Sequence, residues 1–130
     1  MSNLKEIALT KVATVTGIDA KTIATTELYV VPAGMTFIPM FVVIRVTAFT
    51  AGGKGTQAVA SFGGNSATYD DFLNTVTYTV ANQDYFQTDG PPDSSAVPVQ
   101  AAGDSFRISI ETGSDATTET WAVDVFGYLV

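Results

Sequence analysis

The acidic side chains are the residues of this sequence best suited to chemistry, because the chain contains neither histidine nor cysteine. Asp84, Asp89 and Asp93 lie close together, and hard cations such as calcium bind carboxylate oxygens. Their spacing differs from that of the helical calcium loop, and Asp-Gly and Pro-Pro-Asp are common turn sequences. Asp70 and Asp71 are adjacent, so in a strand they point to opposite faces and cannot share a substrate. We interpret this pair as capping backbone N–H groups, and we predict no metal and no cofactor.

Catalysis has little support elsewhere in the sequence. Without histidine and cysteine, the Ser–His–Asp and Cys–His arrangements and ordinary zinc sites are absent. A Ser–Lys pair needs a lysine near a pocket, but Lys54 follows two glycines in a turn and the other lysines lie early in the chain. The sequence GGKG at residues 52–55 lacks the phosphate-loop spacing and the helix that follows such a loop. We predict that the protein is not an enzyme.

The composition predicts a single β-rich domain of 130 residues. Hydrophobic residues make up 46% of the chain and charged residues only 15%, so Thr, Ser, Asn, Gln and Gly must cover the surface, as is typical of β-structure. The net charge of −7 argues against broad nucleic-acid binding, which needs Lys and Arg. The first residues, MSNLKEIALTK, lack the apolar core of a signal peptide, so nothing there directs secretion.

One long apolar run lies between Glu27 and Arg45, which enclose no charged side chain. A membrane-spanning helix is excluded here, because Pro32, Gly34 and Pro39 interrupt the run and many of its other residues are β-branched. The sequence instead predicts two apolar strands joined by a tight turn at residues 31–34. Proline at the second position and glycine at the fourth are typical of a type I turn.

Strand patterns recur throughout the chain, separated by turn signals. The predicted strands lie at residues 4–16, 21–31, 35–50, 56–62, 74–80, 84–88, 104–113 and 118–130. This pattern predicts an all-β fold, an antiparallel eight-stranded β-sandwich of the jelly-roll type. An immunoglobulin-type sandwich is the alternative, but the lone Trp121 comes too late for its pattern. Only residues 67–75 favour a helical turn, with Thr68 or Asp70 as N-cap.

The strand at residues 35–50 is apolar on both of its faces between Phe37 and Ile44. One face can cover the core of a sandwich, and the other needs cover from another subunit or from the N-terminal segment of the same chain. The last strand repeats this feature. We predict a subunit interface formed by Phe37, Ile38, Met40, Phe41, Val42, Ile44, Trp121, Phe126 and Tyr128.

The N-terminal segment differs in charge from the rest of the chain. Residues 1–21 hold three basic and two acidic side chains, whereas residues 22–130 hold three basic and eleven acidic ones. We predict an arm or first strand at residues 1–21 and a sandwich domain at residues 22–130, although three lysines can also be ordinary scatter. The residues predicted to dock the arm on a capsid are Leu4, Lys5, Ile7 and Lys11.

Several of these stretches together resemble small virion structural proteins of tailed bacteriophages, cyanophage-like ones especially. The resemblance is carried by ELYVVPAGMTFIPMFVVIRV, FGGNSATYDDFLN, AAGDSFRISI and VDVFGYLV, in that order along residues 27–130. It implies a jelly-roll domain, commonly trimeric, that decorates or cements a capsid or forms part of a fibre or tail. It implies no active site.

The resulting prediction is a non-enzymatic virion protein, assembled in the host cytoplasm, that stabilises the phage head as a decoration subunit. Its expected partners are further copies of itself, as a homotrimer, and the major capsid protein or other virion proteins. Nucleic acid and membrane are not expected partners. The alternative is a tail-fibre or head-fibre module that binds host glycan or protein through Tyr85, Phe86 and Asp89.

Overall fold

The computed structural model describes residues 8–79, 82–88 and 99–130, and within them the protein is entirely β-structure. The eight strands are β1 Thr10–Asp19, β2 Ala24–Val30, β3 Phe37–Thr50, β4 Val59–Gly63, β5 Leu73–Thr77, β6 Tyr85–Thr88, β7 Ser105–Thr112 and β8 Thr118–Leu129. Each lies within or overlaps one of the eight predicted segments. In this described part of the chain, no helix is long and apolar enough to span a membrane.

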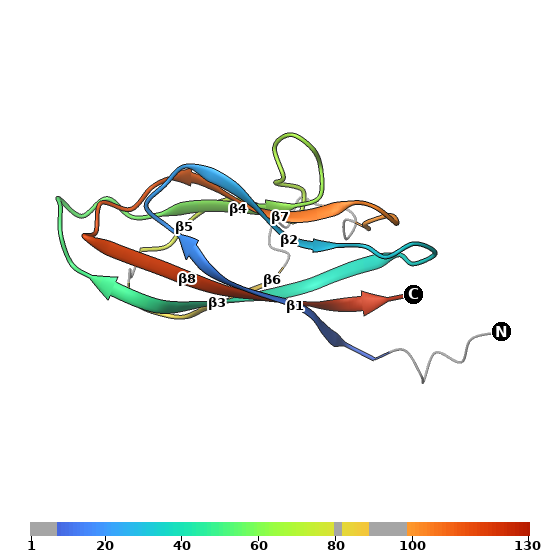
Figure 1. The fold of residues 1–130 in the computed structure, drawn as a ribbon. Coiled ribbons are helices and arrows are strands. Elements are labelled where there is room, and N and C mark those ends of the chain that lie inside the picture. The colour runs from blue at the N-terminus through green and yellow to red at the C-terminus, as the bar shows by residue number, and fades with distance from the viewer. Residues whose placement is uncertain (1–7, 80–81, 89–98) are drawn as a thin grey trace.

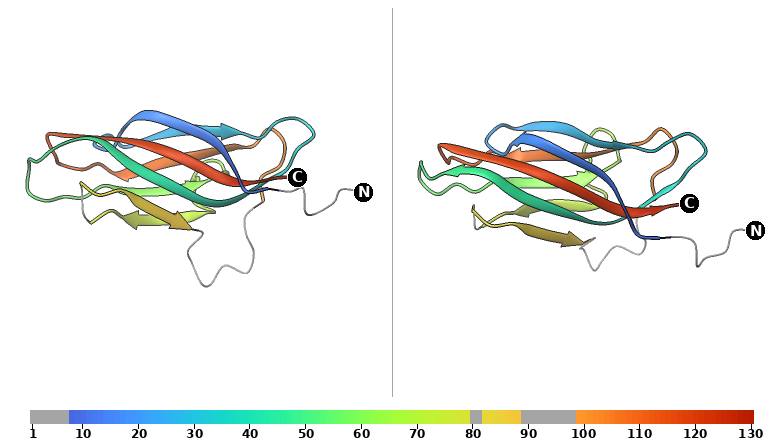
Figure 2. Two further views of the ribbon diagram at one scale, coloured as in Figure 1. Left: turned by 90° about the horizontal axis from the view of Figure 1, so that it is seen from below. Right: turned by 60° about the horizontal axis from the view of Figure 1, so that its bottom comes forward.

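The strands form two antiparallel sheets of four strands each, packed face to face (Figure 1). One sheet has the order β1-β8-β3-β6, which can be followed in Figure 2, and the other has the order β2-β7-β4-β5. The pairing is nested: β1 pairs with β8, β2 with β7, β3 with β6 and β4 with β5. The predicted eight-stranded antiparallel sandwich is thus confirmed, and nested pairing is the strand order that a jelly-roll arrangement requires.

The core fills the space between the two sheets with aliphatic and aromatic side chains. Phe106, Ile108 and Ile110 point inward from β7, as their strict alternation predicts. The ring of Phe106 makes edge-to-face contacts with Phe37 from the opposite sheet and with Phe72. These contacts join the two sheets through one continuous apolar cluster.

A β-bulge in β3 decides which of its apolar side chains reach this core. The register to β8 shifts between Pro39 and Phe41. Phe37 is buried before the bulge, whereas Val42 and Ile44 are buried after it. The core set therefore mixes the two alternating sets of the sequence, because the extra residue reverses the direction of the side chains that follow.

The turn at residues 32–35 joins strands of different sheets. β2 lies in one sheet and β3 in the other, so the two apolar strands that this turn joins do not pair with each other. The turn also begins one residue later than predicted, because the N–H of Met35 donates to the carbonyl of Pro32. Gly34 then stands at the third position with φ of 76°, as in a type II turn rather than type I.

Replacing Gly34 by alanine is expected to destabilise the protein by about 1 kcal/mol, because a Cβ is disfavoured at positive φ. A Cβ at this position would meet nothing within 4 Å beyond the adjoining residues, so backbone strain is the whole effect. Urea denaturation measures it. Gly34→Asn is the control, since asparagine tolerates this conformation, and an alanine variant as stable as the wild type would contradict the assignment of the turn.

Candidate interaction face

The exposed side of the β1-β8-β3-β6 sheet is the surface that the structure singles out, and we call it the outer face. Strand register places Phe86, Val43, Asp124 and Thr14 in one row across the four strands. The neighbouring row holds Thr88, Phe41, Phe126 and Lys11. Opposite residues of a sheet project from the same face, so these eight side chains share one surface.

Three phenylalanines form an aromatic ladder across this face. The ring of Phe41 stacks on Phe126 with 4.5 Å between ring centroids, and it lies against the tilted ring of Phe86 with 4.6 Å between centroids. Phe86 remains 60% exposed, and Met40, which precedes Phe41 on β3, remains 36% exposed. The ladder lies on the side of the sheet that faces away from the core, so the outer face presents apolar surface of the kind that marks an interface.

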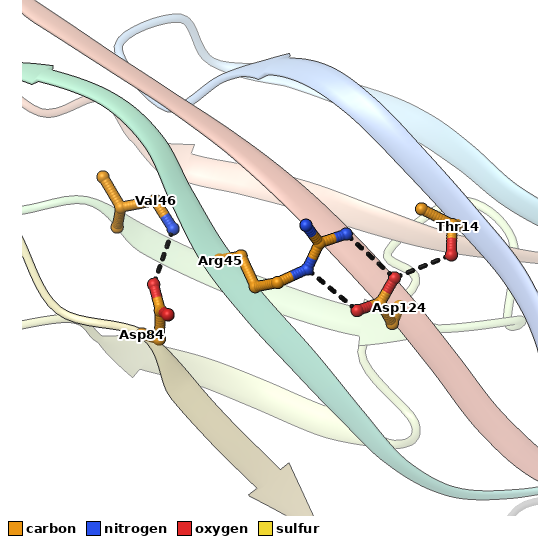
Figure 3. A network of polar contacts seen from close by, with 5 residues as sticks. All are labelled: Thr14, Arg45, Val46, Asp84 and Asp124. Carbon is orange, nitrogen blue, oxygen red and sulfur yellow. Dashed lines mark hydrogen bonds and ion pairs between the residues drawn. The ribbon is translucent and has the colours of Figure 1, made fainter.

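A polar network lies on the same sheet, and the hydrogen-bonding groups drawn in Figure 3 pair with one another. Arg45 donates from Nε to Asp124 at 2.9 Å and from Nη2 at 3.1 Å, and the Thr14 hydroxyl donates to Asp124 at 2.7 Å. Asp84, which immediately precedes β6, accepts the backbone N–H of Val46 at 2.9 Å. Each of these two carboxylates already accepts hydrogen bonds from protein donors. A partner can therefore cover the face without leaving a buried carboxylate unpaired.

The charges of this network shift the pKa values of its members. Partial burial raises the pKa of Asp124, but the hydrogen bonds from Arg45 and Thr14 and the charge of Arg45 outweigh burial, so its pKa lies below the ordinary value. The hydrogen bond to Asp124 correspondingly raises the pKa of Arg45. The pair is therefore ionised throughout the neutral pH range.

The opposite side of the sandwich has a different character. The exposed face of the β2-β7-β4-β5 sheet carries Glu27, Ser105 and Arg107, which bond to one another. The ring of Tyr69 lies under the Arg107 guanidinium at 5.3 Å. This surface is polar and charged, which is the ordinary outcome for one face of an antiparallel sheet. The apolar outer face of the first sheet is the exception.

The residues predicted as a subunit interface divide into two groups. Phe37, Val42, Ile44 and Trp121 lie in the core of the protomer, so their assignment to an interface is corrected. The bulge in β3 and the inward side of β8 account for this placement. The remaining five are partly or well exposed on this sheet: Ile38, Met40, Phe41, Phe126 and Tyr128.

The other predicted site residues are spread over the chain. Leu4, Lys5 and Ile7 lie outside the described residues, as do Asp89 and Asp93. Lys11 lies on β1 opposite Phe126, at the margin of the outer face. Residues 10–19 form β1 of the sandwich. Tyr85 and Phe86 are neighbours on β6 and face opposite ways: Tyr85 packs against Tyr78 of the core, and Phe86 joins the aromatic ladder.

The paired carboxylates hold a loop. Asp71 accepts the backbone N–H of Gly64 at 2.9 Å, and Asp70 accepts hydrogen bonds from Asn65 and Thr68. The predicted helical turn at residues 67–75 is absent, because this described loop consists of turns and bends leading into β5. No group of three or more acidic residues within the described ranges is arranged to hold a metal ion.

Sequence reasoning missed the polar network at the centre of the outer face. Thr14 and Asp124 are 110 residues apart, and Arg45 and Asp124 are 79 apart. The one available signal was a charged residue within an apolar run of each of two strands, Arg45 in β3 and Asp124 in β8. An opposite-charge pair on adjacent strands is the simplest reason for such residues.

The comparisons with known proteins point to a fold. No family model and no curated protein matches the sequence. Among solved structures, a chain in the acidic stable capsid structure of Helicobacter pylori bacteriophage KHP30 is similar, with a TM-score of 0.56 and 10% sequence identity. The likeness covers 95% of this chain and 96% of the other. At this identity it establishes a shared β-sandwich fold over nearly the whole length.

Hydrogen bonds hold the pKa values of further aspartates below their ordinary value. They come mainly from the backbone N–H of Lys21 at Asp19, from the Asn65 side chain at Asp70 and from the backbone N–H of Lys54 at Asp115. A carboxylate whose pKa is lower in the folded state contributes stability above its unfolded pKa, and that contribution is lost as the pH falls.

We therefore expect the free energy of unfolding to be nearly constant from about pH 7 to about pH 5 and to fall below about pH 4, near the unfolded pKa of aspartate. Urea denaturation over this pH range measures the effect. The Asp124→Asn variant is expected to be less stable at pH 7 and to lose less on acidification. Equal losses for the variant and the wild type would show that Asp124 does not contribute.

Proposed function

We propose that this protein is a non-enzymatic structural subunit of a tailed-phage virion, a jelly-roll decoration or cement protein that binds the head. The observation that carries this proposal is the apolar outer face of the β1-β8-β3-β6 sheet, on which the phenylalanine ladder is exposed and the neighbouring ions are already paired. A single-domain sandwich with one such face is suited to contact with other subunits.

Three further features support the proposal. The fold is shared along its length with a chain from a phage capsid structure. The sequence stretches that resemble small phage virion proteins run from β2 through the turn into β3, from β4 through the loop to β5, and along parts of β7 and β8. The adjacent carboxylates Asp70 and Asp71 serve to hold a loop.

Such a subunit acts by burial of surface and by mass action. A stable contact buries about 1,000 Å² or more, and one contact repeated around an icosahedral shell opposes its expansion at every position. The partners in this proposal are other copies of the chain, as a trimer, and the major capsid protein. Assembly takes place in the host cytoplasm.

The segment before β1 is the proposed means of reaching a neighbouring virion subunit. β1 pairs with β8 from Thr10 onward, so a truncation must end at residue 9 to leave the sandwich intact. The truncated protein is expected to fold with unchanged thermal stability and to lose occupancy on purified heads. Full occupancy of the truncated form would refute a docking role for Leu4, Lys5 and Ile7.

Location and copy number on the virion test the function itself. Electron microscopy of intact particles should show the protein on the head, and quantitative gels should give hundreds of copies per particle. A few tens of copies at the tail would instead support the alternative, a fibre module that binds host glycan or protein. In that case Phe86, which is exposed, is the side chain to replace in glycan-array experiments.

A further inference from the structure

We propose that the N-terminal residues 1–9 of one copy lie across the outer face of a second copy, against the ladder of Phe86, Phe41 and Phe126. This inference rests on the proposed function, because it names what covers that face. Each copy can both give its segment and receive the segment of another copy, since the same chain supplies the segment and the surface that receives it.

The segment leaves its own protomer at the start of β1. β1 begins at Thr10 opposite Gly127, and the next residue, Lys11, lies opposite Phe126. The segment thus starts at the margin of the outer face. Ala8 and Leu9 are both exposed, Leu9 to 46%, so the chain carries an apolar side chain into solvent instead of packing it on its own body.

The composition and the length of the segment both fit this placement. It contains the apolar residues Leu4, Ile7 and Leu9, and the charges of Lys5 and Glu6 cancel. An extended chain advances about 3.3 Å per residue, so nine residues reach about 30 Å. A sheet of four strands is only about 14 Å from its first strand to its last. The segment is long enough to cross the outer face of a neighbour.

The charges on the receiving face also suit this segment. Around the ladder, Lys11 and Arg45 balance Asp84 and Asp124, so this part of the outer face is neutral although the whole chain has a net charge of −7. Two copies of such a chain repel each other except where neutral surfaces meet. A neutral apolar segment therefore suits this face better than it suits the acidic remainder of a second copy.

Disulfide mapping tests the proposal, because the wild-type chain has no cysteine. Full-length Leu4→Cys protein with a size tag is mixed with full-length Thr88→Cys protein and oxidised. Thr88 is exposed on β6 opposite Phe41, so a cysteine there leaves the ladder intact. The mixed dimer is expected to form at least about tenfold more than a mixed dimer with Glu111→Cys, the control on the exposed side of the other sheet. Equal yields would overturn the proposal.

Two further measurements exclude the other occupants of the face. In the double variant Leu4→Cys/Thr88→Cys, a disulfide formed within one chain would show that the segment covers its own protomer, and the proposal would fail. On purified heads, crosslinking of Thr88→Cys to the major capsid protein instead of to a second copy would also overturn it. Absence of the protein from virions would refute the proposed function but leave the mixed dimer in solution unaffected.

Discussion

Trp121→Ala is expected to cost about 4 kcal/mol of folding free energy, the largest effect of any substitution considered for this protein. The Trp121 side chain is 1% exposed and meets the ring of Tyr78 edge-on at 5.1 Å. Its Nε1 also donates to the buried carboxylate of Glu119 at 3.0 Å. The alanine variant therefore loses a large apolar side chain and leaves a buried acceptor without its donor.

Urea denaturation of matched variants separates these contributions. Trp121→Phe keeps a ring but removes the donor, and we expect a smaller cost of about 1–3 kcal/mol. Tyr128→Ala, on the outward side of the same strand, is the control and should cost less than about 1.5 kcal/mol. Equal costs for Trp121→Ala and Tyr128→Ala would contradict the placement of Trp121 in the core.

Phe86→Asp is expected to abolish assembly while leaving the protomer folded. Phe86 is 60% exposed on an edge strand, so the substitution removes a ring contact with Phe41 and little buried surface. At the centre of an interface, by contrast, loss of an aromatic side chain costs about 2 kcal/mol or more, which is about a 30-fold loss of affinity. An aspartate would also place an unpaired charge in the contact.

The control for this variant is Ile23→Asp, which introduces the same charge at another exposed apolar residue, 71% exposed between β1 and β2. Occupancy on purified heads and native mass in solution are the two measurements. We expect Phe86→Asp to lose occupancy and Ile23→Asp to keep it. If both variants bind heads like the wild type, the outer face is not the contact surface.

The strand segments of this protein could be predicted from sequence because their signals are local. In β7, Phe106, Ile108 and Ile110 alternate with polar residues, and the predicted inward set is the one that the structure buries. β5 shows the limit of this reasoning. Its predicted alternation runs through Val76 and Tyr78, but Thr75 adopts a positive φ of 48° and bonds to Ser61 of β4. That irregularity depends on a neighbouring strand.

The amino-acid sequence by itself determined the all-β class, the approximate positions of eight strands and the presence of apolar residues on both sides of β3, because alternation and turn residues act over a few neighbours. Only the tertiary structure decided which apolar side chains form the core. The bulge after Pro39 exchanges the two faces of β3, and it is defined only relative to β8. The same pairing brings Thr14, Arg45 and Asp124 together, since contacts between distant strands depend on register.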